Sequence, residues 1–207
     1  MNSPNPKLTP LGIMLLALLY EGDMHPYEML RLLEYRHRDR LVSVTKGSVY
    51  HTVSRLEEQQ LIAEACVDRE GNRPERTSYT LREAGRDAVP AWVRQELPRI
   101  DCPASFNVAL AEAHNLTLAE TVELLTQRKD ALANALRIQV SELADAHDEG
   151  TPEQYLLNFE REAKLLHADL DWIIETLAHI STPGFPWGQG ITPSPAKYNL
   201  HRKAAQQ

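Results

Sequence analysis

The chain opens with a stretch that is apolar for ten consecutive residues. This run, LGIMLLALLY at residues 11–20, is too short to cross a bilayer. Thr9 and Pro10 before it suit the N-cap and the first position of a helix, and Gly22 after it suits a helix end. The pattern therefore predicts a short helix that runs from Pro10 to about Glu21.

Two further helices are predicted before residue 60. One begins near Pro26, has apolar residues on one side, and becomes polar in the run YRHRDR. Thr45 can cap another helix, expected over residues 46–60, whose apolar positions follow helical spacing. Within these segments and the strand that follows, the residues predicted to build the core are Tyr27, Val49, Val53, Leu56 and Tyr79.

Two strands and a fourth helix come next. Residues 62–67 and 77–81 are strand candidates, and the loop DREGNRPER between them is polar and carries turn-forming residues. A helix is expected over residues 83–96, with a bend at Pro90, which removes one backbone hydrogen bond. Three helices followed by a two-stranded hairpin with a basic tip is the order of a winged helix-turn-helix.

In such a domain the third helix enters the major groove of DNA, and its first turns face base edges and phosphates. Here those turns carry basic and hydrogen-bonding side chains, and Gly47 would let a sugar-phosphate backbone come close. The strand hairpin would be the wing. The alternative to DNA binding is that the polar face of this helix and the neighbouring loop are simply exposed to solvent. The predicted DNA-binding residues are Lys46, Ser48, Tyr50, His51, Thr52 and Arg55 on the helix and Arg69, Arg73 and Arg76 on the wing.

Charge is distributed unevenly along the chain. Residues 1–86 hold 12 Lys and Arg and 12 Asp and Glu, whereas residues 87–180 hold 7 against 17. An acidic protein binds a polyanion only through a local surface. Residues 31–55 hold six basic and two acidic side chains, so a nucleic-acid contact is expected there.

The C-terminal half has the pattern of long packed helices. Thr117-Leu118-Ala119-Glu120 has the sequence of a capping box and is expected to open a helix over residues 118–146. A second helix, residues 153–180, carries an apolar seam with alternating steps of three and four residues. The two helices are expected to pack antiparallel. The seam consists of Leu156, Phe159, Ala163, Leu166, Leu170, Ile173, Leu177 and Ile180.

One helical hairpin leaves part of each helix uncovered, so the seam, from Leu156 to Leu177, is predicted to bury its side chains against a second copy of the chain. The alternative is a bundle within one chain that docks on the winged helix. Residues 181–207 are rich in Pro and Gly, end basic and have no periodicity. That segment is expected to be a flexible tail, although Phe185 and Trp187 would also suit a fold-back onto the helices.

Three motifs stand out in the N-terminal half: HPYE at residues 25–28, GSVY at residues 47–50 followed by LE and LI, and RTSYTL at residues 76–81 followed by AG. They resemble motifs of the PadR family of bacterial transcriptional regulators. Members show an H-G/P-Y-E motif, then G-S-x-Y-x-x-(V/L)-x-x-L-E-x-x-G-L, then a wing of R-x-Y-x-L-T-x-x-G. In this chain the motifs correspond to His25–Glu28, Gly47–Ile62 and Arg76–Gly85. Two departures are Pro26, where many members have Gly, and Gln60, where a Gly often closes the recognition helix. The resemblance covers roughly residues 8–92.

The resemblance implies a homodimer that binds double-stranded DNA and usually represses transcription, with release by a small aromatic or drug-like effector. The expected fold is mainly α with a small β-hairpin. It divides into a winged helix-turn-helix domain over residues 1–96, a coiled-coil-like dimerisation domain over 97–180, and the tail over 181–207. The operator is expected to be an inverted repeat. A different class of function is a ligand-binding or protein-interaction module that keeps the winged helix without using it on DNA.

Other chemistry is not indicated. The two cysteines, Cys66 and Cys102, form neither a CxxC pair nor a disulfide framework, and the eight histidines include no HxxxH or HExxH pair. Nothing resembles a nucleophile with its base or a glycine-rich phosphate loop. We therefore expect no enzyme activity, no metal and no cofactor. With no signal-peptide pattern after the apolar run, a cytoplasmic location without membrane contact is the simplest expectation.

Overall fold

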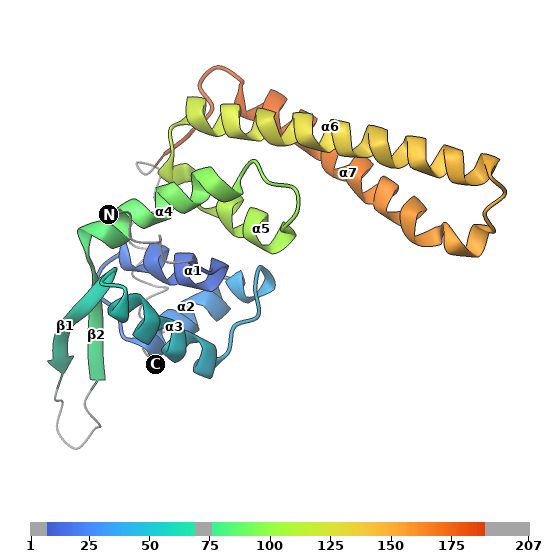
Figure 1. Cartoon of the computed structure of the whole chain (residues 1–207). Helices are drawn as coiled ribbons and strands as arrows, with labels where there is room; N and C mark the ends of the chain where they lie inside the picture. Colours follow the sequence, from blue (N-terminus) through green and yellow to red (C-terminus); the bar gives the residue numbers. More distant parts are fainter. Residues whose placement is uncertain (1–7, 69–75, 189–207) are drawn as a thin grey trace, which may run out of the picture.

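The computed structural model describes residues 8–68 and 76–188. The described chain forms a winged-helix domain from which a long helical hairpin projects (Figure 1). In chain order the elements are α1 (Pro10–Leu19), α2 (Pro26–Tyr35), η1 (Arg38–Arg40), α3 (Lys46–Glu58), β1 (Ile62–Asp68), β2 (Arg76–Leu81), α4 (Glu83–Glu96), α5 (Pro103–Ala111), η2 (Ala113–Asn115), α6 (Leu118–Asp148), η3 (Glu153–Tyr155) and α7 (Leu157–Ile180).

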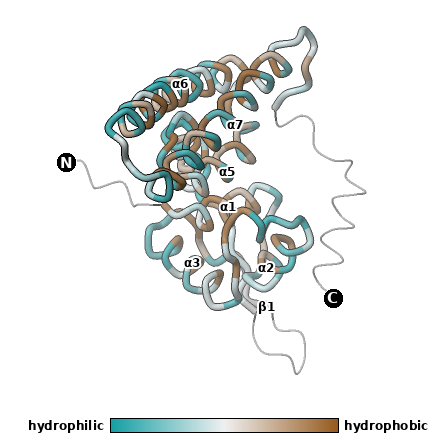
Figure 2. The backbone as a smooth tube through the Cα atoms, turned by 90° about the vertical axis from the view of Figure 1, so that its right-hand side faces the viewer, coloured by the Kyte–Doolittle hydropathy of each residue, from teal (hydrophilic) through white to brown (hydrophobic). Residues whose placement is uncertain are grey.

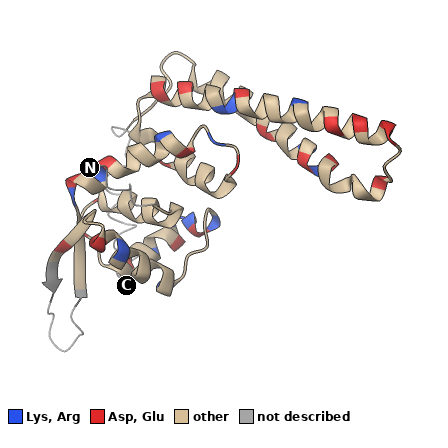
Figure 3. Cartoon of the chain, in the orientation of Figure 1, with Lys and Arg blue, Asp and Glu red and all other residues tan. Residues whose placement is uncertain are grey.

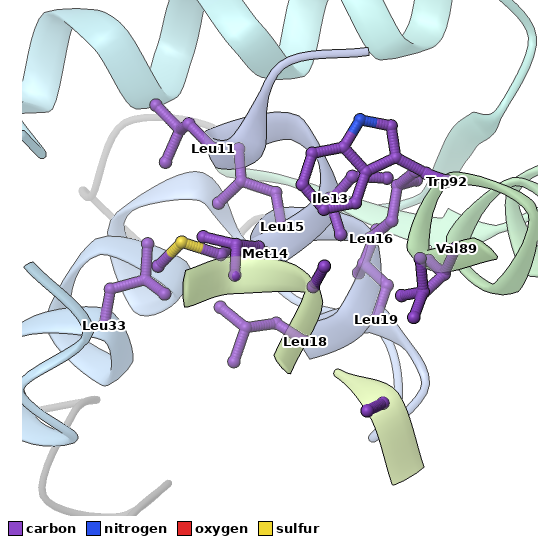
Figure 4. Packing of buried hydrophobic residues seen from close by; sticks show 14 of the residues in the cluster. Leu11, Ile13, Met14, Leu15, Leu16, Leu18, Leu19, Leu33, Val89 and Trp92 are labelled. Atoms are coloured by element: carbon purple, nitrogen blue, oxygen red, sulfur yellow. The ribbon is translucent and has the colours of Figure 1, made fainter. Parts of the chain in front are cut away.

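Helix α1 is the centre of the winged-helix domain. Eight of its residues are buried, and they cover every side of the helix. It lies between α5 and the α2–α3 pair and is uniformly hydrophobic (Figure 2). Side chains from α2 and α4, including Leu33, Val89 and Trp92, pack around it (Figure 4). A helix that is apolar all round is stable only when other elements cover it completely.

The starts of the first three helices follow their N-terminal residues as predicted. The Thr9 hydroxyl accepts a hydrogen bond from the Gly12 amide at 3.2 Å, and Pro10 occupies the first helical position. His25 caps α2 with Nδ1, which accepts from the Tyr27 amide at 3.0 Å. The assignment of Tyr27 to the core is wrong: its side chain is exposed, because it lies in the first turn of α2 on the outer side.

Helix α3 ends in a tight closure made by a residue other than glycine. Gln60 has a φ of 59°, in the left-handed region. The Leu61 amide donates to the Leu56 carbonyl and the Gln60 amide donates to the Glu57 carbonyl, which is the hydrogen-bond pattern of a Schellman motif. Gln60 therefore closes the helix as sharply as a glycine, at a conformational cost that glycine would not have.

The wing strands β1 and β2 pair antiparallel, with Ile62 opposite Leu81 and an irregularity between Glu64 and Cys66. A third segment joins this sheet, because Met24 exchanges two backbone hydrogen bonds with Tyr79, at 3.1 and 3.0 Å. The side chain of Met24 is completely buried. The sheet is thereby connected to the residues that precede α2.

Gly85 allows α4 to pack closely on the end of α3. A Cβ atom at this position would lie 2.3 Å from the carbonyl oxygen of Leu61, which also accepts a hydrogen bond from the Arg82 amide at 3.0 Å. No Cβ atom fits at that distance. The glycine that ends the wing motif is therefore required by the close approach of α4 to the Leu61 carbonyl.

Helix α5 was not predicted from the sequence. It packs on α1 and α4, which places residues 103–111 against the winged-helix domain. Helices α6 and α7 then form an antiparallel pair (Figure 1). Thr117 caps α6 as predicted, but the Glu120 carboxylate binds Arg94 of α4, with 2.5 Å from Arg94 Nε to Glu120 Oε1.

Buried Arg128 anchors the hairpin to the winged-helix domain. Its side chain is 4% exposed and lies over the ring of Phe106, with 3.5 Å from the guanidinium carbon to the ring centroid. It also donates to the backbone carbonyl of Arg99. Burial lowers the pKa of Arg128, and the nearby carboxylate of Asp169 partly opposes this shift. These contacts join α5, α6, α7 and the loop after α4.

The flexible-tail prediction is wrong for residues 181–188. The indole Nε1 of Trp187 donates to the Leu116 carbonyl at 3.0 Å, and the rings of Phe185 and Trp187 lie 6.2 Å apart. Both residues pack against the core. The segment folds back over the start of α6 because its two aromatic rings find apolar surface there, while residues 189–207 lie outside the described part of the chain.

Among the described residues, no helix is long and apolar enough to span a membrane.

Replacing Gln60 with Gly is expected to stabilise the protein by about 1 kcal/mol, because a left-handed conformation costs a residue with a Cβ roughly that much. Chemical denaturation measures the free energy of unfolding. The matched control is Glu58→Gly, which places glycine in the last turn of α3 and should destabilise by about 1 kcal/mol. Equal effects of the two variants would contradict the left-handed assignment of Gln60.

Candidate nucleic-acid interface

The first candidate surface is the outer face of α3. Val49, Thr52, Val53 and Leu56 are buried, which turns the opposite side of the helix to solvent. Thr45 and Ser48 form a reciprocal capping box: each side chain accepts from the backbone amide of the other, at 3.1 and 2.9 Å. The residues exposed on the outer face are Lys46, Gly47, Tyr50, His51, Ser54 and Glu58.

Two of the predicted DNA contacts have structural roles instead. Thr52 is 9% exposed, and its hydroxyl donates to the Ser48 carbonyl at 2.7 Å, so its assignment to the groove is wrong. It directly follows the exposed His51, but each step along a helix turns the side chain by about 100°. Ser48 is only partly exposed, and its hydroxyl is engaged in the capping box.

The structure brings Lys46, Tyr50 and His25 together at the start of α3. The ammonium nitrogen of Lys46 lies 5.9 Å from the centroid of the Tyr50 ring. The rings of Tyr50 and His25 meet edge to face, with centroids 6.3 Å apart. The N-terminal residues of α2 and α3 therefore share one surface. Arg55 is half-buried beside the start of α1, at the edge of this surface.

Gly47 leaves the backbone of the first turn accessible. A Cβ atom at this position would meet nothing within 4 Å. The chain itself therefore has no steric need for glycine there, in contrast to Gly85. An open backbone at a helix N-terminus, with amide groups pointing outward, is a favourable place for a phosphate.

Several of the basic residues counted in residues 31–55 are neutralised in the fold. Arg36 binds the Glu21 carboxylate with two hydrogen bonds, at 2.5 and 2.9 Å. Arg31 and Arg38 are paired with carboxylates at 3.7 and 3.8 Å respectively. The local excess of positive charge is therefore smaller than the sequence count indicates, and it is concentrated toward α3.

The predicted wing residues are only partly covered by the structure. Arg69 and Arg73 lie outside the described residues. Arg76 is the first residue of β2, and its backbone stands opposite Asp68 in the strand register. Their role in binding stays a prediction.

A second candidate surface lies on the projecting hairpin. Most of the predicted seam faces α6 in the same chain: Leu156 and Ile173 are 3% and 0% exposed, so their assignment to a partner chain is corrected. Leu166, Leu170 and Leu177 also pack on the chain's own core, while Ala163 is half-buried and Phe159 is 45% exposed.

Helix α7 carries a further apolar stripe that the sequence analysis missed. Leu157, Leu165 and Trp172 are 62%, 50% and 39% exposed, and their spacing of eight and seven residues puts them on one face, away from the seam. The heptad pattern of the seam concealed this second spacing. Ile138 and Val140 on α6 are exposed as well. Acidic residues gather toward the outer end of the hairpin (Figure 3).

Comparison with known proteins agrees with this geometry. Residues 15–91 match the model of the transcriptional regulator PadR-like family. These residues form a PadR-like domain. They extend from α1 into α4 and so include the helix pair α2–α3 and both wing strands. The family is one of transcriptional regulators, and a regulatory role in transcription is supported for this chain.

Solved structures of PadR regulators resemble the chain at low identity. Bacillus subtilis PadR in complex with operator DNA is 17% identical, has a TM-score of 0.40, and is matched over 84% of this chain and 100% of that chain. Bacillus subtilis PadR in complex with p-coumaric acid is 16% identical, with a TM-score of 0.38 and coverage of 83% and 99%. A PadR family regulator from Clostridium difficile is 22% identical, with a TM-score of 0.36 and coverage of 43% and 88%. No curated protein matches the chain.

Within residues 8–68 and 76–188, no group of three His, Cys, Asp or Glu side chains is placed to hold a metal ion.

Thr52→Ala and His51→Ala are expected to separate the two faces of α3. The Thr52 change removes a buried methyl and hydroxyl and should cost about 1 kcal/mol of unfolding free energy. The His51 change removes an exposed side chain and should alter stability by less than about 0.5 kcal/mol. Urea denaturation of both variants measures the difference, and a larger loss for His51→Ala would contradict the orientation of α3.

Proposed function

We propose that the chain is a sequence-specific DNA-binding repressor, which acts as a homodimer on an inverted-repeat operator and is released by a small-molecule effector. The observation that carries the DNA-binding part is the first turn of α3. It presents Lys46, the open backbone at Gly47, and His51 to solvent on a rigid, doubly capped helix start. A helix of this kind contacts phosphates through its amide groups and base edges through its side chains.

In this proposal the exposed residues of α3 divide into two kinds of contact. Lys46 and Arg55, at the two edges of the outer face, would bind phosphates and fix the helix in the groove. Tyr50, His51 and Ser54 lie between them and would reach base edges. Ser54, which the sequence analysis did not select, is exposed on the same face. The Arg73 and Arg76 wing would bind the backbone next to the groove.

The homodimer is supported by the second apolar stripe on α7. Leu157 and Leu165 form an exposed face on a helix whose other apolar face is already covered by α6. Trp172 continues this face, and its ring also meets the Phe106 ring of α5 edge to face, with centroids 5.9 Å apart. Aromatic and aliphatic side chains grouped on one exposed face are typical of an interaction surface. Two copies related by two-fold symmetry would present two α3 helices to DNA. The operator half-sites would then lie about one helical turn, roughly 10 base pairs, or a multiple of it, apart.

Repression and release by an effector are supported by the family alone. A regulator of this kind would block a promoter while it occupies its operator. An aromatic or drug-like molecule that binds the DNA-free form better than the DNA-bound form would shift the dimer off DNA. We propose this class of effector without assigning it a site.

The alternative, a winged helix used for protein or ligand binding alone, makes a different demand on α3. It requires no accessible backbone at Gly47 and no cation at position 46. Fluorescence anisotropy with fragments of genomic DNA discriminates between the two functions.

Lys46→Ala is expected to weaken binding to every DNA sequence, because it removes one phosphate contact. The slope of log affinity against log salt concentration should become shallower by about one unit. His51→Ala should instead weaken operator binding more than binding to random DNA. The control is Arg137→Ala, which removes an exposed cation from α6. Unchanged affinity in both α3 variants would contradict the assignment of the reading helix.

Leu165→Asp is expected to give a folded monomer. It puts a charge in the middle of the exposed α7 stripe and leaves the packing of the α7 seam against α6 undisturbed. Asn134→Asp adds the same charge at an exposed polar position of α6, outside the α7 stripe, and should leave the dimer intact. Sedimentation velocity at micromolar concentration gives the oligomeric state, and circular dichroism checks the fold. Wild-type protein that sediments as a monomer, with full operator affinity, would contradict the dimer.

A further inference from the structure

A buried carboxylate connects the DNA-reading part of the chain with the base of the long hairpin. Glu112 ends α5 and its side chain is 8% exposed. Its Oε1 atom lies 3.8 Å from Nη1 of Arg38, which begins η1. The side-chain nitrogen Nδ2 of Asn115 lies 2.9 Å from the Glu112 backbone oxygen and 3.4 Å from Oε2 of the Glu112 carboxylate. One acidic group thus holds both the turn between α2 and α3 and the residues just before α6.

The Arg38–Glu112 pair lies close in sequence to the starts of two helices, α3 and α6. From Arg38, η1 and a short connection lead directly to Thr45, the cap of the reading helix α3. From Glu112, η2 leads directly to Thr117, the cap of α6. The elements on the two sides are far apart in sequence, and α3 packs on α1, α2 and β1 with a buried face that is mainly apolar. Apolar contacts slide at lower cost than an ion pair, which has a preferred geometry.

Burial makes the charged form of Glu112 unfavourable. Desolvation raises the pKa of Glu112, and Arg38, His114 and the Asn115 hydrogen bond oppose the shift only in part. Glu21 adds a smaller repulsion. A carboxyl group with a raised pKa in the folded state lowers stability as the pH rises through that pKa, because the unfolded chain holds the charge more easily. At neutral pH the burial of this carboxylate therefore opposes folding.

We propose that Arg38 and Glu112 are a positioning pair, which sets the orientation of α3 relative to the α6–α7 hairpin and thereby the spacing at which the dimer reads its two half-sites. This inference rests on the proposed function. Each α3 must point into its own major groove, and the hairpin is the part that relates one copy to the other. A joint that turns freely by a few degrees displaces the distant reading helix along the DNA. The pair restricts that rotation.

The test uses Glu112→Gln in the full-length chain, with the operator first selected from genomic fragments by the wild-type protein. Gln keeps the size and the hydrogen-bonding capacity of the side chain and removes its charge. Anisotropy titrations compare the selected operator, a single half-site, and operators with one or two base pairs inserted or deleted between half-sites. Glu34→Gln is the matched control, because Glu34 is paired with Arg31 at 3.7 Å on the exposed side of α2.

The expected result is a loss of about tenfold in affinity for the selected spacing, with a flatter dependence on spacing. Affinity for the single half-site should stay within about twofold, and the melting temperature at neutral pH should be equal to or above that of the wild type. Glu34→Gln should behave as the wild type on every duplex. Arg38→Gln should reproduce the changes in operator affinity and spacing dependence, but with a lower melting temperature, because it leaves the buried Glu112 carboxylate without its counter-charge. A folding failure of one variant leaves the other as the test.

Three outcomes overturn the inference. The first overturns the proposed function as well, and the other two overturn the positioning pair alone. Wild-type protein that binds no genomic fragment overturns the proposed function itself. Wild-type protein that binds, together with variants that keep its spacing profile and affinity, overturns the positioning pair alone. Variants that lose half-site and operator affinity equally would assign Arg38 and Glu112 to the local structure of the helix pair, which also overturns it.

Discussion

Complete burial of α1 is the constraint on which the other elements depend. A ten-residue helix with no polar face cannot remain at a surface, so α3, α4, α5 and β2 must all find room on it. This requirement fixes which side of α3 turns inward, because Val53 and Leu56 are needed as cover. It also explains Gly85, since α4 reaches its place only by approaching the Leu61 carbonyl more closely than a Cβ atom permits. The orientation of the exposed face of α3 is thus a consequence of how α1 is covered.

In the proposed DNA-binding role, the same few residues at the start of α3 provide both stability and recognition. Thr45 and Ser48 use their side chains on each other's amides, which gives the helix a defined first turn. Gly47 then stands in an uncrowded position that a larger residue would tolerate. In a helix interior glycine is unfavourable by about 1 kcal/mol relative to alanine. A costly residue without a packing reason, beside a well-built cap, suits a surface that another molecule approaches closely.

Much of the winged helix could be predicted from sequence because its signals are local. Thr9-Pro10, Thr45 and the polar loop between two strand-forming runs act within a few residues, and the helices and strands lie where those signals place them. Thr52 was misplaced because a polar side chain can satisfy its hydroxyl on its own helix and still be buried. Helix α5 was missed because PASFNVALA has no amphipathic pattern, and its stability depends on tertiary packing against α1, α4 and the helical hairpin. The burial of the α7 seam by α6 of the same chain also depends on tertiary packing, so the local pattern could not predict it.

Three contacts near the junction of α5 and α6 could not be predicted from local sequence patterns. Glu112 faces Arg38, Leu116 accepts from Trp187, and Arg128 lies over Phe106. Each pair joins residues far apart in sequence, so their meeting depends on the finished fold. Together they attach the hairpin to the domain that carries α3. A rigid connection is what a dimer needs if two helices are to meet two grooves at a fixed distance.

Hydrogen–deuterium exchange of the full chain with and without its operator duplex tests the central claim most directly, since it needs no substitution. The claim that the outer face of α3 meets DNA predicts slower exchange of the amides at residues 45–51 in the complex. The amides of the hairpin tip, residues 138–160, should exchange equally in both states. Protection confined to the hairpin, with no change in α3, would contradict the assignment of α3 as the reading helix.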